Sequence, residues 1–262
     1  MSHLVVAVAA LGVAILTLFS GFGLGTLLMP VFALFFPIPV AIAATAVVHL
    51  ANNVFKVGLI GRNADWRVVA RFAPPAAAAA FLGALVLRAV SAIEPLAVYR
   101  IGLHTCEIAP INLLIATLML GFAVLELHPR FANFAFSPRQ FVLGGLLSGF
   151  FGGLSGHQGA LRSAFLLKSG LAPVAFVGTG AVCSVVVDIT RLLVYSPSFF
   201  ARDFEALGAG SGRALVATAA AAAFVGTFAG TRLIGKMSLR AMQVLAGVLL
   251  VAIALALGAG II

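Results

Sequence analysis

The chain has 262 residues, of which 63% are hydrophobic and 9% are charged, and its mean hydropathy is +1.19. Soluble domains carry about 25% charged residues, so this composition leaves no room for a soluble catalytic domain and predicts an all-α polytopic membrane protein. The formal charge of +9 comes from 16 Lys and Arg against 7 Asp and Glu. Most basic residues fall in short connections without interleaved exposed aromatics, which indicates topology and anionic-lipid contact, not nucleic-acid binding.

Apolar runs near or above the roughly 20 residues needed to span a bilayer recur along the chain. They are residues 4–22, 40–60, 68–87, 101–127, 174–195, 214–233 and 241–262. The N-terminus lacks the basic region of a secretory signal, so we expect the first run to be retained.

The first run is interrupted by glycines at 21–25, and the apolar piece that follows is too short to cross a bilayer. The next run carries His49, Asn52, Asn53 and Lys56. These positions are i, i+3, i+4 and i+7, so their side chains form one stripe on a helix. A polar stripe in an apolar helix faces other helices or water. We therefore expect either a wall of a binding site or a set of interhelical hydrogen bonds.

Residues 101–127 are predicted to form one long helix, which places His104 and Glu107 three residues apart on one face. Such a pair occurs in metal-binding bundles, but one pair alone makes a poor metal site. A proton relay or an interhelical contact is the better interpretation. Cys106 and Cys183 lie within apolar runs, which predicts buried free thiols and no disulfide framework.

Two halves of the chain resemble each other. PVAIAAT at 39–45 matches PVAFVGT at 173–179, and the same offset in numbering aligns Gly25 with Gly159. An alanine-rich block also recurs in the same order, so duplication is the better interpretation. Each half reads as a broken glycine-rich segment, a polar-studded helix, an alanine-rich helix and a final helix. The predicted divisions are a first repeat at 1–127, a connection at 128–138 and a second repeat at 139–262.

The broken segments allow two topologies. If they are re-entrant hairpins, each half has three full crossings and the halves are inverted. That topology puts eight basic residues on one face and four on the other. The first group is Arg62, Arg67, Arg71, Arg130, Arg139, Arg232, Lys236 and Arg240, and the second is Arg88, Arg100, Arg202 and Arg213. If each half instead has four crossings, seven of these basic residues lie on one face and five on the other. The positive-inside rule therefore favours the re-entrant topology, with both termini outside.

The second broken segment, FGGLSGHQGALRSAFLLKSG, combines five glycines with His157, Gln158 and Arg162. Gly costs roughly 1 kcal/mol relative to Ala inside a helix, and an Arg at bilayer depth costs about 2.5 to 3.5 kcal/mol on insertion scales. This composition predicts a broken helix whose freed backbone groups and polar side chains line a cavity. A short helix that begins near Gly156 and Gly159 would offer N–H groups and a partial positive charge to an anion.

Three side chains of the second half each have two interpretations. The Arg162 guanidinium can hold two oxygens of an oxyanion, or pair with a carbonyl or with Asp188. Asp188 and Arg191 lie three apart on one helix, and we favour a mutual salt bridge. In the alternative, Asp188 neutralises Arg162 in the empty site and is displaced by the anion. His157 can couple anion release to a proton, or it can pack against a carbonyl.

Four motifs carry a resemblance to a known family. They are GLGTLLMP at 23–30, VVHLANNVFK at 47–56, GHQGALRS at 156–163 and VDITR at 187–191. Through them the chain resembles the sulfite exporter TauE/SafE family over nearly its full length. The resemblance implies a transporter of the bacterial inner (plasma) membrane that moves sulfite, sulfonates or related sulfur-containing organic acids. The second copy departs from the family pattern, because His157 and Gln158 interrupt its glycine run and Ala164 stands at the position of Pro30.

We therefore expect an alternating-access site between the halves, near the bilayer midplane. The side chains expected to bind substrate are Arg162, His157, Gln158, Asn52, Asn53 and His49. The expected gate or ion pair is formed by Asp188, Arg191 and Lys56, with Lys56 nearer the membrane surface. The backbone at the helix breaks is expected to contribute through Gly25, Gly156 and Gly159. The expected partners are a small anion and the lipid bilayer, while coupling to protons or another ion and a homodimer stay open.

The alternatives are a transporter of another small organic anion or of a metal cation, and a membrane scaffold. The excess of basic over acidic residues near the site argues against a metal cation. No enzyme and no cofactor are expected, because Asp188 is the only aspartate well inside an apolar run and Ser155 with His157 lacks a supporting third group.

Overall fold

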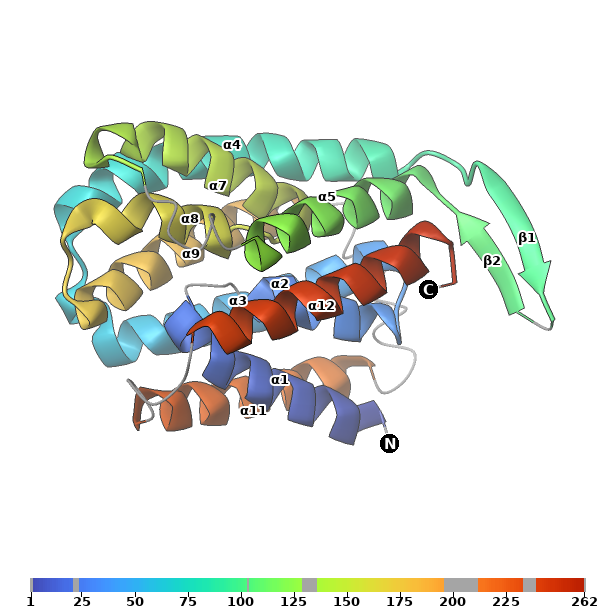
Figure 1. The fold of residues 1–262 in the computed structure, drawn as a ribbon, viewed down its shortest axis with the longest axis horizontal. Coiled ribbons are helices and arrows are strands. Elements are labelled where there is room, and N and C mark those ends of the chain that lie inside the picture. Colours follow the sequence, from blue (N-terminus) through green and yellow to red (C-terminus); the bar gives the residue numbers. More distant parts are fainter. Residues whose placement is uncertain are drawn as a thin grey trace.

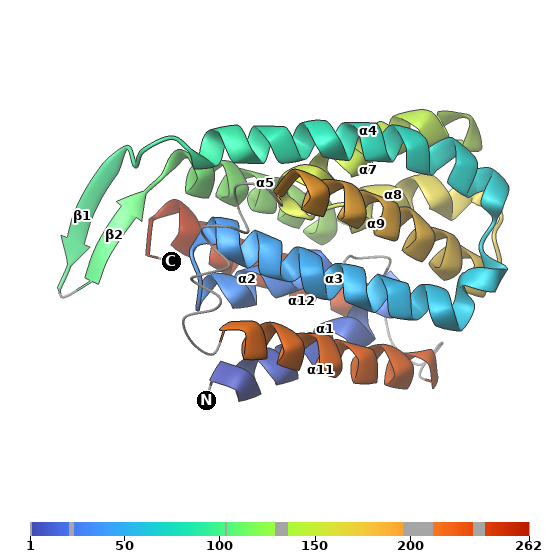
Figure 2. The same cartoon turned by 180° about the vertical axis from the view of Figure 1, so that it is seen from behind.

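A computed structural model describes residues 2–20, 24–102, 104–128, 136–195, 212–232 and 239–261. In this part of the chain the fold is helical apart from one β-hairpin, which confirms the predicted class. The helices are α1 (Ser2–Ser20), α2 (Leu24–Ala33), α3 (Ile38–Ile60), α4 (Trp66–Ser91), α5 (Pro110–Leu127), α7 (Phe141–Ser155), α8 (Gly159–Leu166), α9 (Pro173–Tyr195), α11 (Gly212–Arg232) and α12 (Leu239–Gly258), with short 3-10 turns at Gly61–Asn63, Pro138–Gln140 and Leu167–Ser169. The long helices lie roughly along one axis, and the hairpin projects from one end (Figures 1 and 2).

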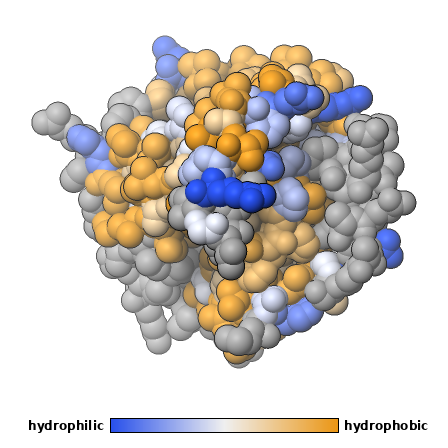
Figure 3. All heavy atoms as spheres, turned by 90° about the vertical axis from the view of Figure 1, so that its right-hand side faces the viewer, coloured by the Kyte–Doolittle hydropathy of each residue, from blue (hydrophilic) through white to orange (hydrophobic). Residues whose placement is uncertain are grey.

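Four stretches are long and apolar enough to cross a membrane by length and composition. They are Ile38–Asn63, Trp66–Ser91, Pro173–Tyr195 and Gly212–Gly230. A helix of 26 residues is about 39 Å long at about 1.5 Å per residue, against a hydrocarbon core of about 30 Å. Large apolar side chains such as Phe81 and Phe228 are exposed on α4 and α11, and hydrophobic residues cover much of the described surface seen from the hairpin end (Figure 3). The surface therefore suits a lipid environment.

Local signals in the sequence set where several helices begin. The Asp65 side chain accepts hydrogen bonds from the backbone N–H groups of Arg67 and Val68, at 2.9 and 3.1 Å, and so caps α4. Prolines stand at the first turns of α3 and α5, where a missing N–H costs no helical hydrogen bond.

The long helix predicted at 101–127 is wrong in its first part. Strands β1 (Ala97–Ile101) and β2 (His104–Ile108) form an antiparallel hairpin, and α5 begins only at Pro110. Gly102 takes a positive φ of 62° in the turn, and the residue before a proline disfavours the helical region. His104 and Glu107 therefore lie on a strand, and the helical spacing that suggested a relay does not apply. The hairpin is tied to the end of α12, because the Glu107 N–H donates to the Gly260 carbonyl at 3.2 Å.

Glycines of α7 form a close seam with α4. A Cβ added to Gly149 would lie 2.1 Å from the Ala76 carbonyl oxygen, and one added to Gly153 would lie 2.0 Å from that of Ala80. Small residues at a spacing of four let two helix backbones approach within direct contact, as in membrane helix pairs. Gly153 of the second broken segment thus serves the packing of α7 on α4 and not the break itself.

Contacts between helices of the two halves show which helix pairs run parallel and which run antiparallel. Gly178 of α9 lies against Ile60 of α3, and Asp188, further along α9, bonds His49, so α3 and α9 run antiparallel. The glycine seam makes α4 and α7 parallel. Other main contacts join α1 to α11, α5 to α12, α4 to α9 and α3 to α11. Matching the helices of the two halves in chain order pairs α1 with α7, α3 with α9, α4 with α11 and α5 with α12. Under this matching the contact of α1 with α11 corresponds to the contact of α7 with α4. The contacts of α3 with α9 and of α5 with α12 each correspond to themselves.

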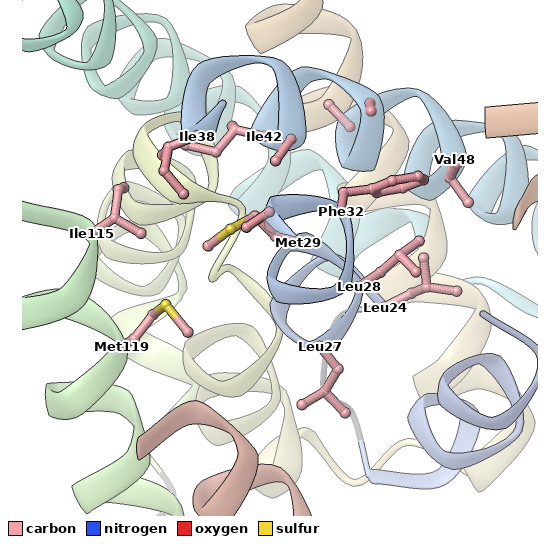
Figure 4. Close-up of a cluster of buried hydrophobic side chains, with 14 of the residues drawn as sticks. Leu24, Leu27, Leu28, Met29, Phe32, Ile38, Ile42, Val48, Ile115 and Met119 are labelled. Carbon is pink, nitrogen blue, oxygen red and sulfur yellow. The ribbon is translucent and has the colours of Figure 1, made fainter. Parts of the chain in front are cut away.

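The short helix α2 is buried at the centre of the largest apolar cluster. All but one of its ten residues are buried. Met29 points from α2 toward Ile38 and Ile115, and Phe32 points toward Val48 (Figure 4). At ten residues α2 is about 15 Å long and cannot cross a bilayer, so the structure confirms that this piece is too short to span.

Candidate functional site

The second broken segment is a hairpin of two helices. Helix α7 ends at Ser155, Gly156 takes a left-handed φ of 83°, and α8 begins at Gly159. The chain then returns along α7, because Phe165 packs on Gly144. This geometry confirms the predicted break and is the shape of a re-entrant segment. In the first half α1 ends at Ser20 and α2 begins at Leu24, while the glycines at 21 and 23 lie outside the described residues.

The starts of the two broken segments meet in the protein interior. A Cβ added to Gly25 would lie 3.3 Å from the Gly156 carbonyl oxygen and 3.7 Å from Cδ2 of His49. Gly25 is buried at the beginning of α2, and Gly156 lies at the end of α7. Gly25 therefore allows the Gly156 carbonyl to approach closely, and the polar side chains around these glycines come from both halves.

Asp188 is the hub of these side chains. Its carboxylate is fully buried on α9 and accepts hydrogen bonds from α3, from the α7–α8 break and from its own helix. The distances are 2.6 Å to His49 Nδ1, 3.3 Å to Asn53 Nδ2, 3.2 Å to Gln158 Nε2 and 2.7 Å to Arg191 Nη2. A buried carboxylate is tolerated when it is paired and hydrogen-bonded in this way. Four of the expected site residues thus converge on Asp188.

Arg191 and Tyr195 hold the end of α7. Arg191 pairs with Asp188 and also donates from Nη1 to the Gly152 carbonyl at 3.3 Å. The Tyr195 hydroxyl donates to the Gly153 carbonyl at 2.5 Å. Carbonyls in the last turn of a helix often lack partners within the helix. Tyr195 supplies a donor to the Gly153 carbonyl, and Arg191 adds a second donor to the Gly152 carbonyl, which also accepts from the Gly156 N–H at 3.0 Å. Arg191 and Tyr195 therefore both stabilise the packing of α9 on the end of α7. Tyr195 was not among the residues expected from the sequence.

Arg162 lies in the first turns of α8 and contacts only neutral groups by hydrogen bonding in the described structure. Its Nη1 donates to Ser184 Oγ at 2.6 Å and to Gln158 Oε1 at 3.3 Å. Gln158 in turn donates to Asp188, so the amide bridges the cation and the carboxylate. A Cβ on Gly180 would lie 3.3 Å from Arg162 Nε, so this glycine gives the guanidinium its room.

Ser184 is a site residue that the sequence reasoning missed. A signal for it exists, because Ser184, Asp188 and Arg191 are i, i+4 and i+7 on α9. The same spacing joins His49, Asn53 and Lys56 on α3.

His157 is placed apart from the carboxylate hub. Its Nδ1 lies 2.9 Å from Ser155 Oγ, and its ring stacks on Phe122 of α5 with 5.1 Å between centroids. Ser155 Oγ lies 3.2 Å from the Phe151 carbonyl, to which it donates. The hydroxyl therefore accepts from Nδ1–H, and Nε2 is a fully buried atom without a hydrogen-bond partner in the described structure.

The polar stripe of α3 divides between two neighbours. Asn53 joins the Asp188 hub, whereas Asn52 accepts a hydrogen bond from Thr227 of α11 at 2.7 Å. The Asn52 amide nitrogen is buried and has no partner among the described residues. Lys56 is buried among the helices, with 7% of its surface exposed.

The buried charges of the described residues are unbalanced. Lys56, Arg162 and Arg191 are buried cations, and Asp188 is the one buried carboxylate among these residues. Uncompensated charge is costly in an interior of low dielectric constant. An anion bound near these helices would reduce the imbalance.

No curated protein and no solved structure matches the chain. The model of the sulfite exporter TauE/SafE family matches residues 6–257, nearly the whole chain. With the helical membrane-type fold and the broken helices described above, this match shows that the chain belongs to the sulfite exporter TauE/SafE family.

Proposed function

We propose that the protein is a multi-pass transporter of the bacterial inner membrane that moves sulfite or a related organosulfonate by alternating access. The observation that carries this proposal is the buried excess of positive charge where the two broken segments meet. The family match supports a transporter of sulfite or related anions. The residues described at the α7–α8 break supply the donors that a three-oxygen anion needs.

The anion would bind beside Arg162 at the start of α8. A guanidinium fork matches two oxygens of a sulfonate or sulfite, and Gln158 and Ser184 already contact this group. In the described conformation Gln158 donates to Asp188. A bound anion would compete with Asp188 for the Gln158 amide, with Asn53 and His49 on the opposite wall and Asn52 turned toward Thr227 of α11.

We also infer that the halves are inverted repeats, with 1–127 and 139–262 as the repeat units. The antiparallel α3·α9 and the exchange of α1·α11 with α7·α4 support this relation. Inverted repeats around a central site give two conformations of similar energy, open to opposite sides, when one half rocks against the other.

The test compares sulfite binding and transport in wild type, Arg162→Gln and Arg162→Lys. Arg67→Gln is the matched control, since Arg67 is exposed at the start of α4. Purified protein would be titrated with sulfite and sulfoacetate by thermal shift, and uptake of labelled sulfite would be followed in proteoliposomes. We expect Arg162→Gln to weaken binding by about 30-fold or more, the usual effect of removing one partner of a buried charge pair. A folded Arg162→Gln protein that binds and transports as the wild type does would refute this site.

A further inference from the structure

Two of the three buried cations have no carboxylate partner. Asp188 pairs with Arg191 and His49, and no carboxylate of the described residues lies within ion-pair distance of Lys56 or Arg162. Arg162 is hydrogen-bonded to two neutral side chains, Ser184 and Gln158. The unbalanced charge of the site is therefore carried by one cation from each half of the chain.

The packing of α3 on α9 brings these two cations to one level of the bundle. Ile60 lies beside Gly178, and His49 bonds Asp188, so Lys56 on α3 is level with the part of α9 between those two contacts. Arg162 contacts the same part of α9, at Gly180 and Ser184. The like charges of Lys56 and Arg162 act on each other there.

Two buried, mutually repelling cations are unfavourable in the empty protein. Asp188 attracts both of them at longer range, but its carboxylate is already held by His49, Asn53, Gln158 and Arg191. The neutral donors around Arg162 give no compensating charge. An anion between the two cations would supply it, and two negative charges would balance both.

We propose that Lys56 and Arg162 form a two-cation clamp that selects anions with two negative charges over anions with one. This inference rests on the proposed function and names the substrate class of the same site. Arg162 would hold a sulfonate or sulfite group through its planar fork, while Lys56 would act as a flexible point charge on the second anionic group or on the second charge of sulfite. The clamp joins the two halves, because Lys56 belongs to α3 and Arg162 to α8.

The test uses two ligands of similar size and different charge. Sulfoacetate carries a sulfonate and a carboxylate, and ethanesulfonate carries the sulfonate alone. Their dissociation constants would be measured on purified wild type, Lys56→Gln and Lys56→Arg at pH 7 and constant ionic strength. Arg67→Gln, at an exposed cation, is the control for general charge effects.

We expect the wild type to bind sulfoacetate about tenfold or more tightly than ethanesulfonate, a difference equal to one well-placed charge contact. Lys56→Gln should remove most of that preference and leave the ethanesulfonate affinity within about threefold, and Lys56→Arg should retain the preference. If Lys56→Gln weakens the binding of both ligands equally, or if the wild type binds both with equal affinity, the clamp is wrong. Neither result would contradict the proposed anion transport. Binding of neither ligand, nor of sulfite, would overturn the proposed function as well.

The melting temperature of the ligand-free protein gives a second measurement that needs no substrate. Replacing a repelling buried ammonium by the apolar, similarly long side chain in Lys56→Met should raise it, because the buried charge is removed with little change of volume. A lower melting temperature for Lys56→Met would mean that the ammonium has a stabilising partner and is not part of an anion clamp.

Discussion

The Asp188→Asn substitution tests whether the buried carboxylate holds the centre of the protein together. The side chain is fully buried and accepts hydrogen bonds from four donors, of which Arg191 at 2.7 Å and His49 at 2.6 Å are the shortest. An amide of the same shape keeps the volume but removes the charge, so the Arg191 guanidinium loses its anionic partner. Breaking a buried ion pair by removing one partner costs about 3 to 5 kcal/mol.

That cost can be read in a melting experiment. For a chain of this size, 1 kcal/mol corresponds to a shift of about 2 to 4 °C in Tm, so Asp188→Asn should melt on the order of 10 °C below wild type. The assay is thermal unfolding of purified protein in one detergent, followed by intrinsic fluorescence at a fixed heating rate. Asp65→Asn is the matched control, because asparagine also caps helices well and Asp65 is a half-buried cap at the start of α4.

A double substitution separates the ion pair from other effects of the change. Asp188→Asn combined with Arg191→Met removes both charges, so its Tm should lie above that of Asp188→Asn alone. Arg191 also donates to the Gly152 carbonyl, and we therefore expect partial recovery only. A Tm for Asp188→Asn within about 2 °C of wild type, or strictly additive effects in the double variant, would refute the assignment of Asp188 as the hub.

Two further substitutions test the packing of the broken segment. Gly149→Ala should destabilise by about 1 to 3 kcal/mol, because its Cβ would lie 2.1 Å from the Ala76 carbonyl oxygen. Gly121→Ala is the control on α5, where a Cβ meets nothing within 4 Å. Its free energy of unfolding should be unchanged or higher by up to about 1 kcal/mol, because alanine has the better helix propensity. Equal Tm values for the two variants would contradict the close packing of α7 on α4. Tyr195→Phe should cost about 1 to 3 kcal/mol, because it leaves the Gly153 carbonyl without this donor, and limited proteolysis should show faster cutting near the α7–α8 break than in wild type.

Much of the helical fold could be predicted because apolar runs and broken segments are local properties of the sequence. The break at Gly156 and the short length of α2 followed from glycine positions and from the length needed to span a bilayer. The hairpin at 97–108 could not be found by hydropathy, since its apolar residues continue the run of α5. Pro110 is the local signal that the helix starts there, because proline is favoured in the first turn of a helix and unfavourable in its interior.

The members of the candidate site were found more easily than their contacts. Periodicity placed Asn52 and Asn53 on one polar stripe, but neighbouring helix positions differ by about 100°, and the structure turns Asn52 to Thr227 and Asn53 to Asp188. Which helices those side chains meet depends on how α11 and α9 pack on α3. Packing between distant segments leaves no periodic signal in either one.

Glycine shows why composition alone could not separate the site from its scaffold. In the second broken segment Gly156 has a positive φ that other residues adopt at a cost, and it is needed for the turn between α7 and α8. Gly153, only three residues earlier, lies in a regular helix and is needed because the Ala80 carbonyl occupies the place of its Cβ. Both are glycine for steric reasons, but one shapes the backbone and the other admits a neighbouring helix. The difference lies in the partner helix α4, so only the packed structure separates the glycine that forms the turn from the glycine that belongs to the seam with α4.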